Sequence, residues 1–163
     1  MSRGRTIAGT MAVIVVVGAA LRGVSRRFEI KESSMSPALE PGDWTIAKRR
    51  SGIPDRGDIV VFDDPSGSGM SLVKRVIGLP GEQVVVDRGR VSIDGVILAD
   101  RWANGVTRPD DSWSVPVGHV WVLGDSRGAS RSDGRIFGAI PIDAIGWQIV
   151  ARYWPRSRIA IIG

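Results

Sequence analysis

From Phe28 onward the chain consists of short apolar runs separated by turn residues, and this pattern limits the folds open to it. Valine and isoleucine dominate several runs, and glycine or proline interrupts the chain between them. No long stretch has the 3.6-residue period of an amphipathic helix, so the pattern predicts a mostly β domain of short strands. The runs lie at residues 43–48, 58–62, 71–77, 83–87, 90–93, 119–123 and 148–154.

Two segments between these runs carry distinct turn signals. Asp94-Gly95 lies between the run at 90–93 and the apolar pair Val96-Ile97, which predicts a two-residue β-hairpin. Residues 104–114 hold no comparable run, and we expect them to form a long loop. The 163 residues suit one domain with a real hydrophobic core.

The N-terminal segment differs from the rest of the chain. Residues 6–21 carry no charge, and arginines flank them on both sides. A helix needs about 20 residues to cross a bilayer core, and flanking arginines can extend to the headgroups. We therefore expect residues 1–27 to form an N-terminal membrane anchor with a transmembrane helix, and residues 28–163 to form the β-rich domain. The flanking residues are Arg3, Arg5, Arg22, Arg26 and Arg27.

A removable signal peptide is the alternative interpretation of the same segment. Gly18 and Ala20 are small residues with the spacing that a cleavage site after Ala20 requires. A cluster of three arginines directly after the apolar run is unusual behind a cleavage site, which favours the uncleaved anchor.

The distribution of charge argues against a nucleic-acid-binding protein. The net charge is +5, and all five excess arginines lie in residues 1–27, so the 17 basic side chains of residues 28–163 match their 17 acidic ones. A nucleic-acid-binding domain usually carries its basic excess on the folded part.

Composition removes several kinds of catalytic site. The chain has no cysteine and a single histidine, His119, which excludes thiol nucleophiles and histidine-rich metal sites. In an extended strand His119 faces the same way as Val117 and Trp121. We interpret it as a packed or half-exposed strand residue rather than as the base of a serine-histidine relay.

A serine hydrolase without a histidine needs another base, and lysine can serve if it is neutral near pH 7. Because the pKa of free lysine is about 10.4, burial has to lower it by several units. Strand alternation places Lys74 on the same face as Leu72 and Val76, as this role requires. A lysine in such a strand can also lie at a sheet edge with its amine in water.

The candidate nucleophile lies in residues 32–37. Pro37 restricts its own backbone and disfavours a helical conformation at Ser36. Ser34 in such a stiff turn can present its hydroxyl, and nearby backbone amides can stabilise an oxyanion.

Taken together, the sequence motifs are specific. They comprise SMSP at residues 34–37, RGDIVVF at 56–62, KRVIGLPG at 74–81, GDSR at 124–127 and SRSDGRIFG at 130–138. Motifs of these kinds in this order resemble the type I signal peptidase (leader peptidase) family in its short single-anchor bacterial form. The resemblance extends from Lys31 to about Arg152 and includes the apolar segment ahead of it.

The resemblance implies a role for each matching residue. Ser34 is the nucleophile of a serine endopeptidase, and its backbone N–H stabilises the oxyanion. Lys74 is the general base, so the site contains a Ser-Lys dyad. Ser130 and Asp133 support the site and position the lysine. The resemblance implies no cofactor and no metal.

The resemblance also implies a substrate and a location. The family removes signal peptides from exported preproteins after small residues at positions −1 and −3, so two shallow apolar pockets should flank the nucleophile. The expected partners are these signal peptides, the lipid bilayer and the secretion translocon, with no nucleic acid. The expected location is the cell membrane, with a single-pass anchor and the β-rich catalytic domain on the outer, non-cytoplasmic face.

The chain departs from the family pattern at several positions. Glu32 stands where the family often has a serine or a glycine, and in some members that serine donates a second oxyanion hydrogen bond. We expect the Glu32 carboxylate to point away from the site. Ser126 and Gly134 replace the usual asparagine and serine. The last motif has one residue more than usual between Gly124 and Asp133. Counting forward from Gly124 gives Ser130 as the supporting serine. Counting back from Asp133 reaches Arg131, next to Ser132. We prefer Ser130.

Three other functions fit parts of the same pattern. One is a dedicated processing peptidase for a single pilin or secreted peptide. Another is a relative of the self-cleaving SOS repressors, although their helical DNA-binding module is absent from this sequence. The third is a catalytically inactive, membrane-tethered domain that binds exported chains.

Overall fold

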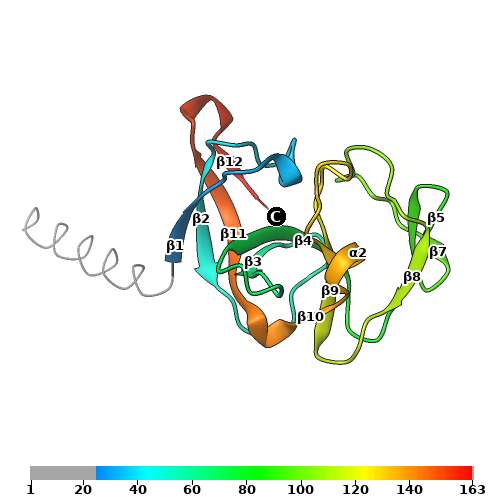
Figure 1. The fold of residues 1–163 in the computed structure, drawn as a ribbon. Coiled ribbons are helices and arrows are strands. Elements are labelled where there is room, and N and C mark those ends of the chain that lie inside the picture. The colour runs from blue at the N-terminus through cyan, green and yellow to red at the C-terminus, as the bar shows by residue number, and fades with distance from the viewer. Residues whose placement is uncertain (1–24, 163) are drawn as a thin grey trace, which may run out of the picture.

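The computed structural model describes residues 25–162, which form two antiparallel β-sheets (Figure 1). The larger sheet has eight strands in the order β1-β2-β11-β3-β4-β9-β10, and β12 pairs with β11. Its strands are β1 (Ser25–Glu29), β2 (Trp44–Arg49), β3 (Ile59–Asp63), β4 (Ser71–Gly78), β9 (His119–Leu123), β10 (Ile140–Pro141), β11 (Ile145–Trp154) and β12 (Ala160–Ile161).

The smaller sheet lies on the opposite side of β4 and β9 from β1 and β2 (Figure 1). Its strand order is β7-β6-β5-β8. These strands are β5 (Gln83–Asp87), β6 (Arg90–Ile93), β7 (Val96–Ile97) and β8 (Asp111–Ser114). The helical elements are short: η1 (Ser33–Met35), α2 (Gly134–Phe137), η2 (Ile142–Ala144) and η3 (Arg156–Arg158).

A shared core joins the two sheets. Trp121 of β9 is fully buried, and its ring lies 4.9 Å from that of Trp113 of β8 at a tilt of 36°. Its indole N–H donates to the Gly134 carbonyl at 2.9 Å. Each aliphatic side chain buried here contributes about 1.5–3 kcal/mol. Packed in the same cluster are Ile77, Val84, Val86, Val91, Ile93, Val115 and Leu123.

Most of the predicted strands are confirmed. Three predicted runs, 83–87, 90–93 and 119–123, coincide with β5, β6 and β9. The Asp94-Gly95 hairpin is also confirmed, because Ile93 pairs with Val96 and both turn residues have the positive φ that this turn type requires.

One loop prediction is wrong in part. Residues 104–114 are not all loop, because Asp111–Ser114 form β8 and pair with β5. This strand lies at the edge of the small sheet, where mostly polar residues are tolerated, so it lacks the apolar run by which the other strands were identified.

The expected membrane anchor begins outside the described residues. Arg26 and Arg27, which the sequence analysis grouped with the anchor, belong to β1 and pair with β2. Within residues 25–162, no helix combines the length and the apolar character that crossing a bilayer demands.

Candidate active site

Ser34 lies in the short helical turn η1. The next residue, Met35, anchors this turn. Its side chain is buried in the core cluster that includes Ile30, Leu39 and Ile59. On the other side, the carbonyl of Ser34 accepts a hydrogen bond from the Ser126 N–H at 3.0 Å. Because its carbonyl and the neighbouring side chain are both held, the Ser34 hydroxyl has a defined position.

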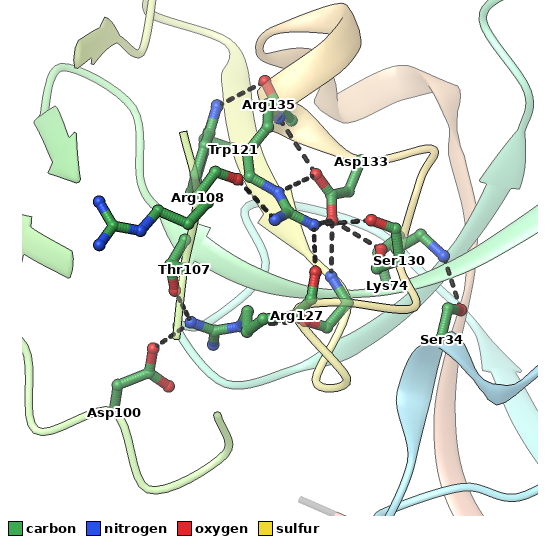
Figure 2. Close-up of polar contacts among 12 residues, drawn as sticks. Ser34, Lys74, Asp100, Thr107, Arg108, Trp121, Arg127, Ser130, Asp133 and Arg135 are labelled. Carbon is green, nitrogen blue, oxygen red and sulfur yellow. Dashed lines mark hydrogen bonds and ion pairs between the residues drawn. The ribbon is translucent and has the colours of Figure 1, made fainter. Parts of the chain in front are cut away.

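Lys74 reaches Ser34 from strand β4, 40 positions along the chain. Its Nζ donates a hydrogen bond to Ser34 Oγ at 2.8 Å (Figure 2). The lysine is 3% exposed and the serine 8% exposed, so water has little access to either group. The alternation prediction is confirmed, since Leu72 and Val76, on the same face of β4, pack in one buried cluster.

Burial changes the acid–base behaviour of this amine. Desolvation lowers the pKa of Lys74 below its ordinary value of 10.5, because the charged form loses its hydration inside the protein. The negative charges of Asp133 and Glu32 act in the opposite direction but do not cancel the effect. A neutral amine at hydrogen-bond distance from a hydroxyl can accept the hydroxyl proton, which makes the oxygen nucleophilic.

Ser130 and Asp133 lie next to this pair, in the loop between β9 and α2 (Figure 2). Ser130 Oγ donates to Asp133 Oδ2 at 2.6 Å, and the Gly124 N–H donates to the same oxygen at 3.2 Å. Of the two serines that sequence counting left open, Ser130 is therefore the one that contacts Asp133. Asp133 also begins α2, since its side chain accepts the Arg135 N–H.

Arg135 holds the aspartate, and the sequence analysis gave this residue no role. Its guanidinium donates to Asp133 Oδ1 at 2.9 Å and to Oδ2 at 2.8 Å, and also to the Ser130 carbonyl at 2.7 Å. Burial alone would raise the pKa of Asp133, but the hydrogen bonds from Arg135 and Ser130 bring it below 3.8. Asp133 is therefore ionised at neutral pH. The only hint in the sequence was the position of Arg135 two residues after Asp133.

Two glycines allow this loop to pack closely. A Cβ on Gly124 would lie 2.6 Å from the Ser34 carbonyl oxygen and closer still to Ser130 Oγ. A Cβ on Gly134 would lie 2.6 Å from the Trp121 indole nitrogen. The second contact explains why serine, the usual residue of the family at position 134, does not fit here.

A second polar network supports the loop from the small-sheet side. Arg75 and Asp125 form a buried bidentate pair at 2.8 and 2.6 Å. Arg127 is buried, pairs with Asp100 at 2.6 Å and donates to the Gly124 carbonyl at 3.0 Å. Through these contacts Asp125 and Arg127 stabilise the loop.

A cavity of about 270 Å³ opens beside the Ser34–Lys74 pair. Residues 29–32, Ser34, Met35 and residues 70–74 line it. Glu32 is exposed, yet it borders this cavity and its charge acts on Lys74. That the carboxylate points away from the oxyanion stays a prediction, but its charge does reach the catalytic pair.

His119 plays no part in this arrangement. It is half-buried in β9, its ring Nδ1 lies 3.2 Å from the Val117 carbonyl, and it borders a different cavity. Its interpretation as a strand residue is confirmed. Across residues 25–162, no group of three or more metal-ligating side chains could hold a metal ion.

Comparisons with known proteins agree on one family. The family model described as "Signal peptidase, peptidase S26" matches residues 3–154. A signal peptidase I of Leptolyngbya laminosa is 36% identical over 169 aligned residues, covering 94% of this chain and 81% of the relative. A probable signal peptidase I-2 of Synechocystis is 31% identical, covering 93% of this chain and 72% of the relative.

A solved structure supports the fold. The crystal structure of a signal peptidase I from Enterococcus faecalis is similar with a TM-score of 0.51 and 31% sequence identity. The similarity covers 59% of this chain and 96% of that one.

Proposed function

The chain belongs to the signal peptidase family, peptidase S26, and from this premise we propose that it removes signal peptides from exported preproteins with Ser34 as nucleophile and Lys74 as general base. One observation carries the proposal: a buried lysine amine lies 2.8 Å from a buried serine hydroxyl. Serine peptidases need such a base–nucleophile pair, and lysine replaces histidine in known variants.

The geometry suggests how each bond is made and broken. Neutral Lys74 takes the hydroxyl proton as Ser34 Oγ bonds to the scissile carbonyl carbon, and the backbone N–H of Ser34 stabilises the oxyanion. The C–N bond then breaks, and protonated Lys74 gives its proton to the leaving amine. Water, deprotonated by Lys74, attacks the acyl-enzyme, and collapse of that intermediate returns the proton to Ser34. Asp133 and Ser130 hold the loop beside the amine throughout.

An unpaired strand edge supports peptide binding in the cavity. β4 pairs with β3 from Ser71 onward, but its pairing with β9 begins only at Arg75. On that side no strand of the described chain covers residues 71–74, which line the cavity. An extended peptide can add to this edge by backbone hydrogen bonds and place alternate side chains against the apolar wall of Ile30, Met35 and Leu72.

The substrate assignment predicts strong selection by size at the cleavage position. A preprotein with alanine at −3 and −1 should be cut once, after −1, and phenylalanine at −1 should slow cleavage at least about tenfold, because overfilling a packed pocket is costly. Mass spectrometry of the products and the initial rates test this. Equal rates for alanine and phenylalanine would contradict the assignment, and an uncut preprotein would favour an inactive binding domain.

The lowered pKa of Lys74 predicts the pH profile. The base works only when neutral, so kcat/KM should fall as the pH drops through the pKa of Lys74. Because burial lowers that pKa, the midpoint should lie below the ordinary lysine value of 10.5. A fluorogenic peptide assayed between pH 5 and 10 measures the midpoint, with circular dichroism at each pH as the control for unfolding. Activity that increases on acidification would exclude a lysine base.

We propose that the enzyme works at a membrane. Residues 6–21 provide the anchor, with the catalytic domain on the outer face, next to the secretion translocon. In the described domain, Trp44 and Trp154 are register partners on β2 and β11, and they are 37% and 50% exposed. Tryptophan favours the headgroup region, so these two side chains are suited to contact lipid.

A further inference from the structure

The charges around the cavity at Ser34 do not balance. Lys31 pairs with Glu29 at 2.5 Å, so these two neutralise each other. Glu32 forms no hydrogen bond or ion pair with residues 25–162, although it borders the same cavity. The facing wall, residues 70–73, carries no charge. Lys74 is the remaining charged side chain of the lining, and it must be neutral to act as the base.

In the reactive form, Glu32 therefore gives the lining a net charge of −1. As the scissile carbonyl becomes an oxyanion near the Ser34 N–H, Lys74 gains a proton, so the net charge around the cavity stays at −1. The Glu32 carboxylate and the oxyanion repel each other, and in a partly enclosed cavity this repulsion is stronger than in bulk water. Glu32 also favours the protonated form of Lys74, which cannot act as a base. A substrate cation that pairs with Glu32 neutralises this net charge and weakens both effects.

We propose that Glu32 is a specificity-determining residue, which makes the enzyme favour substrates with a lysine or arginine within two residues of the scissile bond. The inference rests on the proposed function, because it concerns the substrate of the same site. A cationic side chain at −2, +1 or +2 passes next to the nucleophile when the peptide lies along β4. There it pairs with Glu32, which has no counter-ion in the described part of the protein.

The effect should be moderate and dependent on salt. Glu32 is exposed, and partly solvated ion pairs change rates by only about two- to fivefold. The influence of Glu32 should weaken as the ionic strength rises from about 0.05 to about 0.5 M, because the Debye length shrinks to a few Å over this range.

The test uses the full-length protein in detergent and three sets of peptides. Each peptide has alanine at −3 and −1, and carries lysine, glutamine or glutamate at −2, +1 or +2. For the wild type, we expect kcat/KM at one or more of these positions to follow the order lysine, glutamine, glutamate, with about two- to fivefold per step. Glu32→Gln should remove this order, and Glu32→Lys should reverse it.

A matched control separates local from general charge effects. Asp87 is an exposed carboxylate at the end of β5, on the small sheet and outside the cavity lining. Asp87→Asn changes the net charge as Glu32→Gln does, and it should keep the wild-type order of peptides.

Each outcome has one meaning. The inference is overturned if the wild type cleaves the lysine, glutamine and glutamate peptides equally at each of the three positions. It is also overturned if Glu32→Gln keeps the preference for lysine. Either result leaves the proposed function intact, because the glutamine peptides are still cleaved by the wild type and not by Ser34→Ala. If the wild type cleaves none of the peptides, the proposed function fails and the inference fails with it.

Discussion

Replacing Lys74 by arginine is expected to lower kcat/KM for a signal-peptide substrate by about a thousandfold or more. The guanidinium group stays protonated at every pH at which the protein is folded, so it cannot accept the proton of Ser34 Oγ. General-base catalysis contributes about 10²–10⁴-fold, and a mispositioned nucleophile loses more. The measurement is the initial rate on a fluorogenic peptide, beside Ser34→Ala as the reference for complete loss.

A second variant separates loss of the base from loss of the fold. Lys74 is 3% exposed, so the larger arginine could disturb the packing between Leu72 and Val76. Lys74→Met has an unbranched side chain nearly as long as that of lysine but without the amine, and it should be as inactive as Lys74→Arg. Its melting temperature should equal or exceed that of the wild type, because a buried amine is costly to desolvate. A Lys74→Met enzyme that retains a tenth of wild-type activity would refute the assignment of the base.

The double variant Ser34→Ala/Lys74→Ala tests whether the two residues act together. Residues that act as one catalytic unit show strongly non-additive losses. The double variant should therefore be no less active than Ser34→Ala alone. A further loss would mean that Lys74 acts in a way independent of the serine.

The sequence was most informative where local chemistry decides the structure. The Asp94-Gly95 turn was predictable because few dipeptides allow positive φ at two successive positions. Strand alternation placed Lys74 on the same face as Leu72 and Val76, although it left open whether the amine is buried or in water. In both cases the neighbours along the chain supply the physical cause.

Contacts between distant segments were not predictable in the same way. Strands β1 and β8 carry mostly polar residues and are stabilised by pairing with β2 and β5, which no local pattern reveals. The influence of Glu32 on Lys74 depends on how η1 packs against β4, two elements far apart in sequence. Motif resemblance suggested Ser34 and Lys74 as a pair, but only the fold provides their 2.8 Å separation.

The role of Gly124 was also not predictable from the local sequence. It depends on contacts with Ser34, which is remote in sequence, and with Ser130, which lies across the loop. The glycine lies where the loop after β9 touches the backbone of the nucleophile. A methyl group there would meet the Ser34 carbonyl oxygen at 2.6 Å and would also collide with Ser130 Oγ. Real Cβ atoms essentially never approach other atoms so closely, so the loop or the nucleophile must move.

Gly124→Ala is therefore expected to reduce kcat/KM by about a hundredfold, because a shift of about 1 Å at reacting groups costs that much. It should also lower the free energy of unfolding by about 1–3 kcal/mol through overpacking. Gly128→Ala is the matched control: it lies in the same loop, and its Cβ would have no atom within 4 Å. Peptide cleavage and urea unfolding measure the two effects. If both variants keep wild-type rates, the loop does not need this close contact with Ser34 for catalysis.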